Sequence, residues 1–108
     1  AVLLPAVLDC NAHSCAGKYA TLARAAGLPG SVDTLAVRSL KNALQRLRKT
    51  LGMPADLKAA GVDPRQLWYD TERIVATVLQ DPCCGTNPMQ VEDFMIRKVL
   101  EEVSGRDR

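Results

Sequence analysis

Residues 33–51 read DTLAVRSLKNALQRLRKTL, and this stretch determines the fold class. Its large aliphatic side chains recur three or four positions apart, at Val37, Leu40, Leu44, Leu47 and Leu51. That spacing places them along one face of an α-helix, with polar residues on the opposite face. Ser31 or Asp33 can cap the first turn. We therefore predict an amphipathic helix that packs through its leucine face.

The residues before this helix show the same periodicity. Residues 1–11 are predicted to be helical, with an apolar face made of Val2, Leu3, Ala6, Val7 and Cys10. The polar run 11–14 is expected to end that helix, and Ser14 is expected to cap a second helix that ends near Gly27. The buried face of the second helix is predicted to contain Tyr19, Leu22, Ala23 and Ala26.

The residues after position 51 are predicted to add more helix. Gly52-Met53-Pro54 ends the leucine-rich helix, and residues 55–60 are expected to form a single turn or a short helix. Asp63 followed by Pro64 is a helix start signal. The helix that it opens is expected to run to about Leu79 and to bury Leu67, Thr71, Ile74, Val75 and Val78.

The C-terminal part completes an all-helical pattern. Residues 81–88 are rich in proline, glycine and asparagine and are predicted to form a loop, and residues 91–103 a last helix. No segment alternates apolar and polar residues as a strand would, and the chain has few aromatic residues for a β-sandwich core. The sequence therefore predicts one all-α domain, a multi-helix bundle over residues 1–108.

Charge and hydropathy argue against nucleic-acid and membrane partners. The net charge is +2, too small to favour a polyanion, so the basic face formed by Arg38, Lys41, Gln45, Arg48 and Lys49 is interpreted as a solvated surface rather than a nucleic-acid stripe. No apolar run approaches the roughly 20 residues that span a bilayer. The apolar residues 1–8 have no basic residues before them, which argues against a signal peptide.

The four cysteines allow two interpretations. A small secreted disulfide scaffold is one, but the other residues already supply a core, and a bridge between the adjacent Cys83 and Cys84 would be strained. Reduced thiols in a cytoplasmic protein is the interpretation that we favour. The localisation expected from this reasoning is cytoplasmic.

The sequence does not contain a recognisable set of catalytic or metal-binding residues. His13 is the single histidine and is expected to be exposed. Cys10 and Cys15 do not have the CxxC spacing of a zinc site, and the acidic pairs at 92–93 and 101–102 are interpreted as helix-surface residues. We therefore predict no catalytic, cofactor-binding or metal-ligating residue within this chain.

The segment from Asp81 to Pro88 is the most chemically distinctive part of the sequence. Its two thiols, small residues and asparagine are suited to close approach by a ligand or another backbone. The same residues are also typical of a plain helix–helix connection, in which asparagine and proline shape the turn. The residues by themselves leave both interpretations open.

Four segments in order resemble the iron-containing (group III) alcohol dehydrogenases. Residues 81–88, Asp-Pro-Cys-Cys-Gly-Thr-Asn-Pro, look like that family's Asp-x-Cys-x-x-x-Asn-Pro loop. Residues 1–5 are similar to its Leu-Leu-Pro helix, and residues 17–27 to the helix that follows. Residues 52–62 resemble its connecting segment of the type Gly-Ile-Pro-x-x-Leu…Gly-Val.

The resemblance implies an enzyme of two domains. An N-terminal α/β domain would bind NAD or NADP, and a C-terminal helical domain of the dehydroquinate synthase-like, iron alcohol dehydrogenase type would hold a divalent metal, often iron, through one Asp and three His. The last of these ligands would fall just before Ala1. With the capless start at Ala1, this implies a fragment that is inactive alone and that partners with the missing nucleotide-binding domain.

The resemblance assigns one residue a place at the site. Cys83 corresponds to the family's loop cysteine, which lies beside the substrate and nicotinamide pocket and would shape that pocket rather than act as a nucleophile. Cys84 has no counterpart in the motif, and Met89 stands where arginine is common.

A second function of a different class remains open. The chain could be a stand-alone helical module for interaction or oligomerisation, derived from such an enzyme. In either case, an apolar face left without its partner domain is expected to promote self-association. A third possibility, DNA binding, is disfavoured by the small net charge.

Overall fold

The computed structural model describes residues 1–105, and these form helices joined by turns. The helices are α1 (Leu4–Ala25), α2 (Asp33–Thr50), α3 (Pro64–Tyr69), α4 (Thr71–Leu79), the 3₁₀ helix η1 (Pro82–Thr86) and α5 (Asp93–Val103). No strand occurs between residues 1 and 105, so the all-α prediction is confirmed. None of the helices in this part of the chain is both long and apolar enough to cross a membrane.

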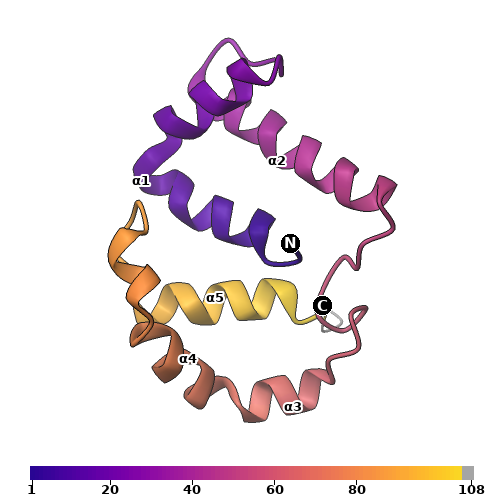
Figure 1. Ribbon diagram of the computed structural model, residues 1–108, viewed down its shortest axis with the longest axis vertical. Helices are drawn as coiled ribbons and strands as arrows, with labels where there is room; N and C mark the ends of the chain where they lie inside the picture. Colours follow the sequence, from indigo (N-terminus) through magenta and orange to yellow (C-terminus); the bar gives the residue numbers. More distant parts are fainter. Residues whose placement is uncertain (106–108) are drawn as a thin grey trace.

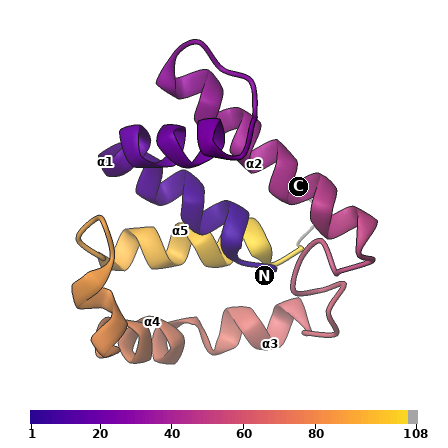
Figure 2. The same ribbon diagram turned by 45° about the horizontal axis from the view of Figure 1, so that its top comes forward.

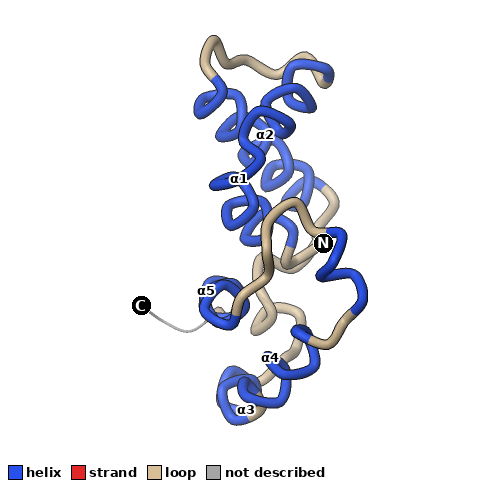
Figure 3. Tube along the Cα trace, turned by 90° about the vertical axis from the view of Figure 1, so that its left-hand side faces the viewer, coloured by secondary structure: helices blue, strands red, loops and turns tan. Residues whose placement is uncertain are grey.

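The helices form two groups that meet at α1. Helices α1 and α2 pack as a hairpin, and the first half of α1 also contacts α5, which packs on α4. In Figure 1 the hairpin lies above α5, and α3 and α4 follow one another along the lower edge. Figures 2 and 3 show the same order, with α5 between α1 and the α3–α4 segment.

The core of the hairpin is built from small side chains. Ala20, Ala23 and Ala36 are fully buried, and Leu8 and Val37 complete the cluster. Because alanine has no side chain beyond Cβ, the two helix backbones can approach closely. The turn before α2 is equally tight, since a Cβ added to Gly30 would lie 2.4 Å from the backbone nitrogen of Ala36. Close helix–helix contact therefore holds this half of the fold together.

Helix α1 differs from the two helices predicted for residues 1–27. It begins at Leu4 and continues through the polar run 11–14, and the break appears instead as a kink at Cys15, where φ is −137° and ψ is 35°. Ser14 is exposed within the helix and does not cap it. The predicted break is therefore present but displaced to Cys15, because Asn11, interpreted as a helix breaker, is buried in the helix and hydrogen-bonded to Asn87.

The buried face predicted for residues 14–27 was partly wrong. Ala23 is buried and Tyr19 is half-buried against the core, but Leu22 is 57% exposed and Ala26 is also exposed. Ala20 takes the central position instead. The packed side of this part of α1 runs through Ala16, Ala20 and Ala23, so Leu22 lies beside it, and Ala26 is the C-cap beyond the end of the helix.

Helix α2 confirms the prediction from residues 33–51, with two corrections. Neither Ser31 nor Asp33 caps it, because the N-cap is Val32, and the Asp33 carboxylate instead accepts from Arg24 at 3.1 Å. The leucine face is buried only over its first half. Leu47 and Leu51 are 54% and 64% exposed, since no described element covers the end of α2.

The helix predicted over residues 63–79 is divided in two. Asp63 caps its start as predicted, accepting from the backbone N–H of Arg65 at 2.9 Å. Helix α3 then ends at Tyr69, and α4 begins at Thr71, whose hydroxyl donates to the carbonyl of Leu67 at 3.0 Å. Residues 55–60 are turns, as predicted, and the Leu57 N–H donates to the carbonyl of Val103 at 2.8 Å.

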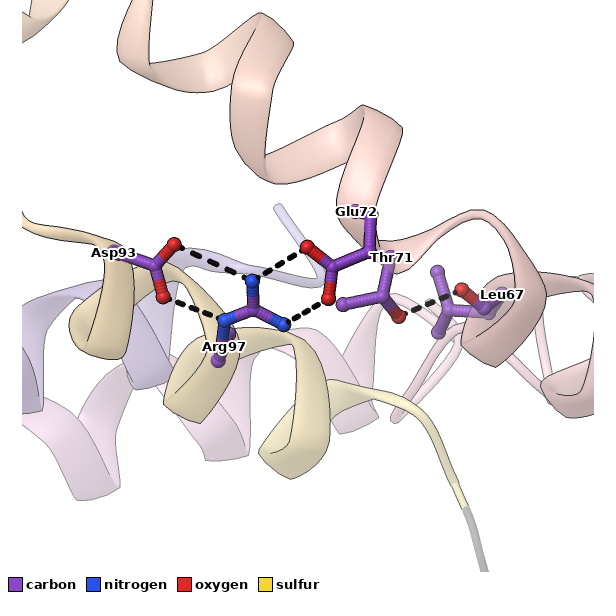
Figure 4. Close-up of polar contacts among 5 residues, drawn as sticks. All are labelled: Leu67, Thr71, Glu72, Asp93 and Arg97. Atoms are coloured by element: carbon purple, nitrogen blue, oxygen red, sulfur yellow. Dashed lines mark hydrogen bonds and ion pairs between the residues drawn. The ribbon is translucent and has the colours of Figure 1, made fainter.

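Arg97 of α5 forms an ion pair with Glu72 of α4. The Arg97 guanidinium donates two hydrogen bonds of 2.8 Å to Glu72 on α4, and its Nε donates to Asp93 on its own helix at 2.5 Å (Figure 4). The hydrogen bonds and charge of Arg97 lower the pKa of Glu72, and its hydrogen bond lowers the pKa of Asp93. A bidentate pair of this kind fixes orientation as well as distance.

Replacing Gly30 with alanine should destabilise the chain by about 1–3 kcal/mol, because the new Cβ would overlap the start of α2. Urea unfolding measures the difference. Gly17→Ala is the matched control: its Cβ would meet only Asp33 Oδ2, at 3.8 Å, inside a helix. That variant should gain about 0.5–1 kcal/mol. Equal effects of the two changes would contradict the close packing described.

The ion pairs of Arg97 with Glu72 and Asp93 should make the free energy of unfolding sensitive to acid. The folded-state pKa values of Glu72 and Asp93 are lowered, so the unfolded chain binds protons first as the pH falls. The free energy of unfolding should therefore decrease once the pH falls below the ordinary pKa values of these groups, 4.5 and 3.8. Arg97→Met should be less stable than the parent at pH 7, and the gap should narrow towards pH 3. Urea unfolding across this range measures it, with Arg46→Met on α2 as the control. A constant gap would contradict the coupling.

Candidate functional site

A cavity of about 390 Å³ lies where α1, α4, η1 and α5 meet. Most of its wall is aliphatic and comes from the three α-helices and the segment before α5: Leu3, Val7, Ile74, Val78, Val91, Met95, Ile96, Val99 and Leu100. The polar lining comes chiefly from η1 and its flanks, as Asp81, Cys83, Cys84 and Asn87, with Cys10 and Asn11 added from α1. An apolar wall with a few polar groups is the usual composition of a small-molecule site.

Two asparagine side chains join α1 to the segment after η1. Asn11 Nδ2 donates to Asn87 Oδ1 at 3.0 Å, and Asn87 Nδ2 donates back to Asn11 Oδ1 at 2.9 Å. Asn87 Nδ2 also donates to the carbonyl of Met89 at 2.7 Å. Asn11 is 4% exposed, so leaving its amide unpaired would cost about 1–3 kcal/mol. This reciprocal pair spans 76 positions of the chain.

Asp81 sets the start of η1 and the environment of Cys83. Its carboxylate accepts from the backbone N–H of Cys83 at 2.8 Å and so caps the 3₁₀ helix. The hydrogen bond to Asp81 and its negative charge raise the pKa of the Cys83 thiol, because the thiolate would be repelled by the carboxylate. Cys83 is exposed, and a raised thiol pKa suits a residue that shapes a wall better than a nucleophile.

Two further thiols line the same cavity. Cys84 is half-buried, and its Sγ donates to the carbonyl of Val78 at the end of α4, at 3.0 Å. Cys10 is buried on α1, and burial raises the pKa of its thiol. The fourth thiol, Cys15, donates to the carbonyl of Asn11 at 3.2 Å. All four cysteines are free thiols.

The structure brings the predicted loop to a cavity and adds residues that the sequence did not indicate. Cys83, the residue singled out from the sequence, lines the cavity, and Cys84 and Asn87 lie beside it. Asn11 and Cys10 were missed, because they lie on α1, far away in sequence. A polar asparagine on an otherwise apolar helical face was the available signal, but it was interpreted as a helix break.

The remaining candidate residues lie apart from this cavity. His13 is exposed on α1, as predicted, although within a helix rather than a loop. On the basic face of α2, Lys41 pairs with Asp9 and Arg48 donates to the carbonyl of Ala55 at 3.4 Å. Within residues 1–105, no three His, Cys, Asp or Glu side chains are placed to hold a metal ion. We therefore derive no chemical step at a metal from these residues.

Residues 1–104 match the family of Fe-containing alcohol dehydrogenases, specifically its C-terminal region. A match over nearly the whole chain shows that the chain belongs to this family. The resemblance found in the sequence and the all-helical fold agree with this result.

Characterised relatives point to the same family. The chain is 29% identical over 101 residues to an NADPH-dependent butanol dehydrogenase of Clostridium saccharobutylicum, covering 94% of this chain and 26% of that protein. It is 31% identical over 106 residues to a 4-hydroxybutyrate dehydrogenase of Cupriavidus necator, covering 94% and 25%. An aldehyde-alcohol dehydrogenase of Clostridium acetobutylicum is 35% identical over 71 residues, which is 66% of this chain and 8% of that enzyme.

The chain therefore spans about a quarter of the length of the first and second of these relatives. No solved structure matches it.

Proposed function

We propose that this chain is the helical part of an NAD(P)-dependent, metal-dependent alcohol dehydrogenase, an oxidoreductase acting on CH–OH groups. The match of residues 1–104 to the iron-containing alcohol dehydrogenases carries the proposal. The names of the relatives support it, since each is a dehydrogenase and one is NADPH-dependent. The metal ligands and the nucleotide-binding domain are expected in other parts of the complete protein, and the four free thiols favour a cytoplasmic location.

In this proposal the chain supplies one wall of the substrate pocket. Cys83 shapes that wall, and the aliphatic side chains of α1, α4 and α5 behind it favour an alcohol with an apolar chain. The 108 residues alone are expected to be inactive, because the described part offers no metal site of its own. The residues of this chain would form part of the pocket wall, and a metal and a nicotinamide bound elsewhere in the complete protein would supply Lewis-acid and hydride-accepting chemistry.

The direct test is an assay of the complete protein that contains these residues. It should reduce NAD⁺ or NADP⁺ with a primary alcohol such as butan-1-ol, lose the activity after chelator treatment and recover it with Fe²⁺ or another divalent ion. The isolated chain should show no such activity. Absence of alcohol-dependent reduction by the metal-loaded protein, with either nucleotide, would contradict the proposal.

The role of Cys83 has a separate test. In the complete protein, Cys83→Ala should change the KM for the alcohol or for the nucleotide by roughly threefold or more, because a wall residue alters fit. Its metal content, measured by mass spectrometry, should not change. Thr86→Ser is the matched control, as Thr86 is exposed on the same 3₁₀ helix and does not line the cavity, and serine keeps the hydroxyl that donates to the carbonyl of Cys83. Loss of the metal in Cys83→Ala would refute this assignment.

A stand-alone interaction or oligomerisation module is the second candidate, and the exposed apolar residues favour it. Leu47 and Leu51 continue the leucine face of α2 into solvent, and Trp68 and Tyr69 at the end of α3 are 67% and 78% exposed. Large exposed aromatic and leucine side chains are typical of a surface that another chain or domain covers. In the dehydrogenase, the nucleotide-binding domain would be that partner.

Sedimentation of the 108-residue chain tests the apolar surface. We expect a dimer or larger species at micromolar concentration, because the exposed leucines are stabilised by association. The double variant Leu47→Lys, Leu51→Lys should shift the chain towards monomer. Lys49→Ala, which changes a polar position of the same helix, is the control. A well-folded parent that sediments only as monomer would exclude self-association through this face.

A further inference from the structure

The Asn11–Asn87 pair is a polar contact in an otherwise aliphatic part of the molecule. It joins α1 to the segment after η1 through two reciprocal hydrogen bonds of 3.0 and 2.9 Å, and both residues line the cavity. Asn11 is almost fully buried, so its amide is shielded from competing water. Two bonds between matched amides fix the orientation of both side chains as well as their distance.

The remaining hydrogen bonds of this loop are local. Asp81 accepts from Cys83, Cys84 donates to Val78, and Thr86 donates to Cys83, so these side-chain bonds stay within residues 78–86. They shape η1 but do not tie it to α1. The bonds of Asn87 do so, and its third bond, to the carbonyl of Met89, also fixes the chain that leads to α5.

Neighbouring residues of α1 hold Asn11 in position. The carbonyl of Asn11 accepts from Cys15 at the kink, and the Tyr19 side chain interacts with both Asn11 and Cys15. Tyr19 in turn packs against the buried cluster between α1 and α2. The amide of Asn11 is therefore set by the best-packed part of the fold, while Asn87 sits on a short loop segment that depends on it.

We infer that Asn11 and Asn87 form a latch that holds the Cys83 loop on α1 and so controls access to the cavity. In the proposed dehydrogenase they are positioning residues, because they act on the substrate wall through the loop and not on the substrate. Their role in the reaction rests on the proposed function, whereas the latch itself can be tested without any activity. Opening the latch exposes the cavity thiols Cys84 and Cys10.

Thiol labelling measures the latch directly. N-ethylmaleimide reacts with each cysteine at a rate that peptide mass spectrometry resolves, and Cys84 is half-buried at the cavity wall. Asn87→Ala should raise the labelling rate of Cys84 by about tenfold, as expected for losing a buried hydrogen-bonded pair. Cys15 is the internal reference, because its partner is the backbone carbonyl of Asn11, which no side-chain change removes.

Two further variants test whether faster labelling of Cys84 reflects loss of the amide pair or unfolding of the chain. Asn87→Asp keeps the size and shape of the side chain but removes both donor bonds of Nδ2, to Asn11 and to Met89, and should also raise Cys84 labelling. Asn42→Ala removes an exposed asparagine from α2 and should change nothing. Labelling of Cys84 that stays at the parent rate, or that rises only together with Cys15, would overturn the latch.

Kinetics of the complete protein then separate the latch from the proposed function. If both hold, Asn87→Asp should change the KM for the alcohol at least threefold while metal content stays near that of the parent and the protein remains folded at the assay temperature. A rise in Cys84 labelling with unchanged kinetics would confirm the latch and argue against this cavity as the substrate pocket. An unchanged labelling rate would overturn the latch whatever the kinetics show.

Discussion

The close packing of α1 on α2 is the constraint on which the rest of the structure depends. Three alanines are fully buried between these helices, and the turn that joins them leaves no room for a side chain at Gly30. Interfaces of small residues derive their strength from close backbone approach and from the many weak contacts that it permits. Once α1 is held in this way, its first half becomes the platform on which α5 and the η1 loop are placed.

Helix α1 serves both groups through different faces. Leu8, before the kink at Cys15, and Ala20 and Ala23, after it, pack on α2. Cys10 and Asn11 lie on another face of the same helix and line the cavity shared with α4 and α5. The cavity is thus a consequence of how α1 divides its surface between two partners.

The elements themselves were largely predictable, and their relative placement was not. Regular apolar spacing identified α2, and a cap followed by proline identified the start of α3, because both signals are local. Apolar periodicity continues across Asp70 and therefore did not indicate the break between α3 and α4. The kink at Cys15 lies one residue after the predicted break at residues 11–14. Asn11 shows most clearly why relative placement was not predictable. A buried asparagine is stable only with a partner, and that partner, Asn87, lies 76 positions away.

The candidate site shows the same division between local and distant information. The loop 81–88 stood out in the sequence because its residues are chemically unusual, and Cys83 was the natural choice within it. The aliphatic wall opposite consists of ordinary core residues, such as Val7 and Ile96, whose spacing predicts burial but not which cavity they line. Sequence patterns could therefore identify the loop residues of the site, but not Asn11 and Cys10 on α1 or the apolar wall.

The arrangement around Cys83 also explains why a loop this short needs support from α1. A 3₁₀ helix of five residues has few internal hydrogen bonds, and none of the residues of η1 is buried. Its position therefore cannot come from its own packing. Asp81 shapes its first turn, and the amide pair of Asn87 and Asn11 connects its end to a helix already fixed by α2. The Asn11 side chain thus links the cavity wall to the helix that packs on α2, in addition to the hydrogen bond between Cys84 and Val78 of α4.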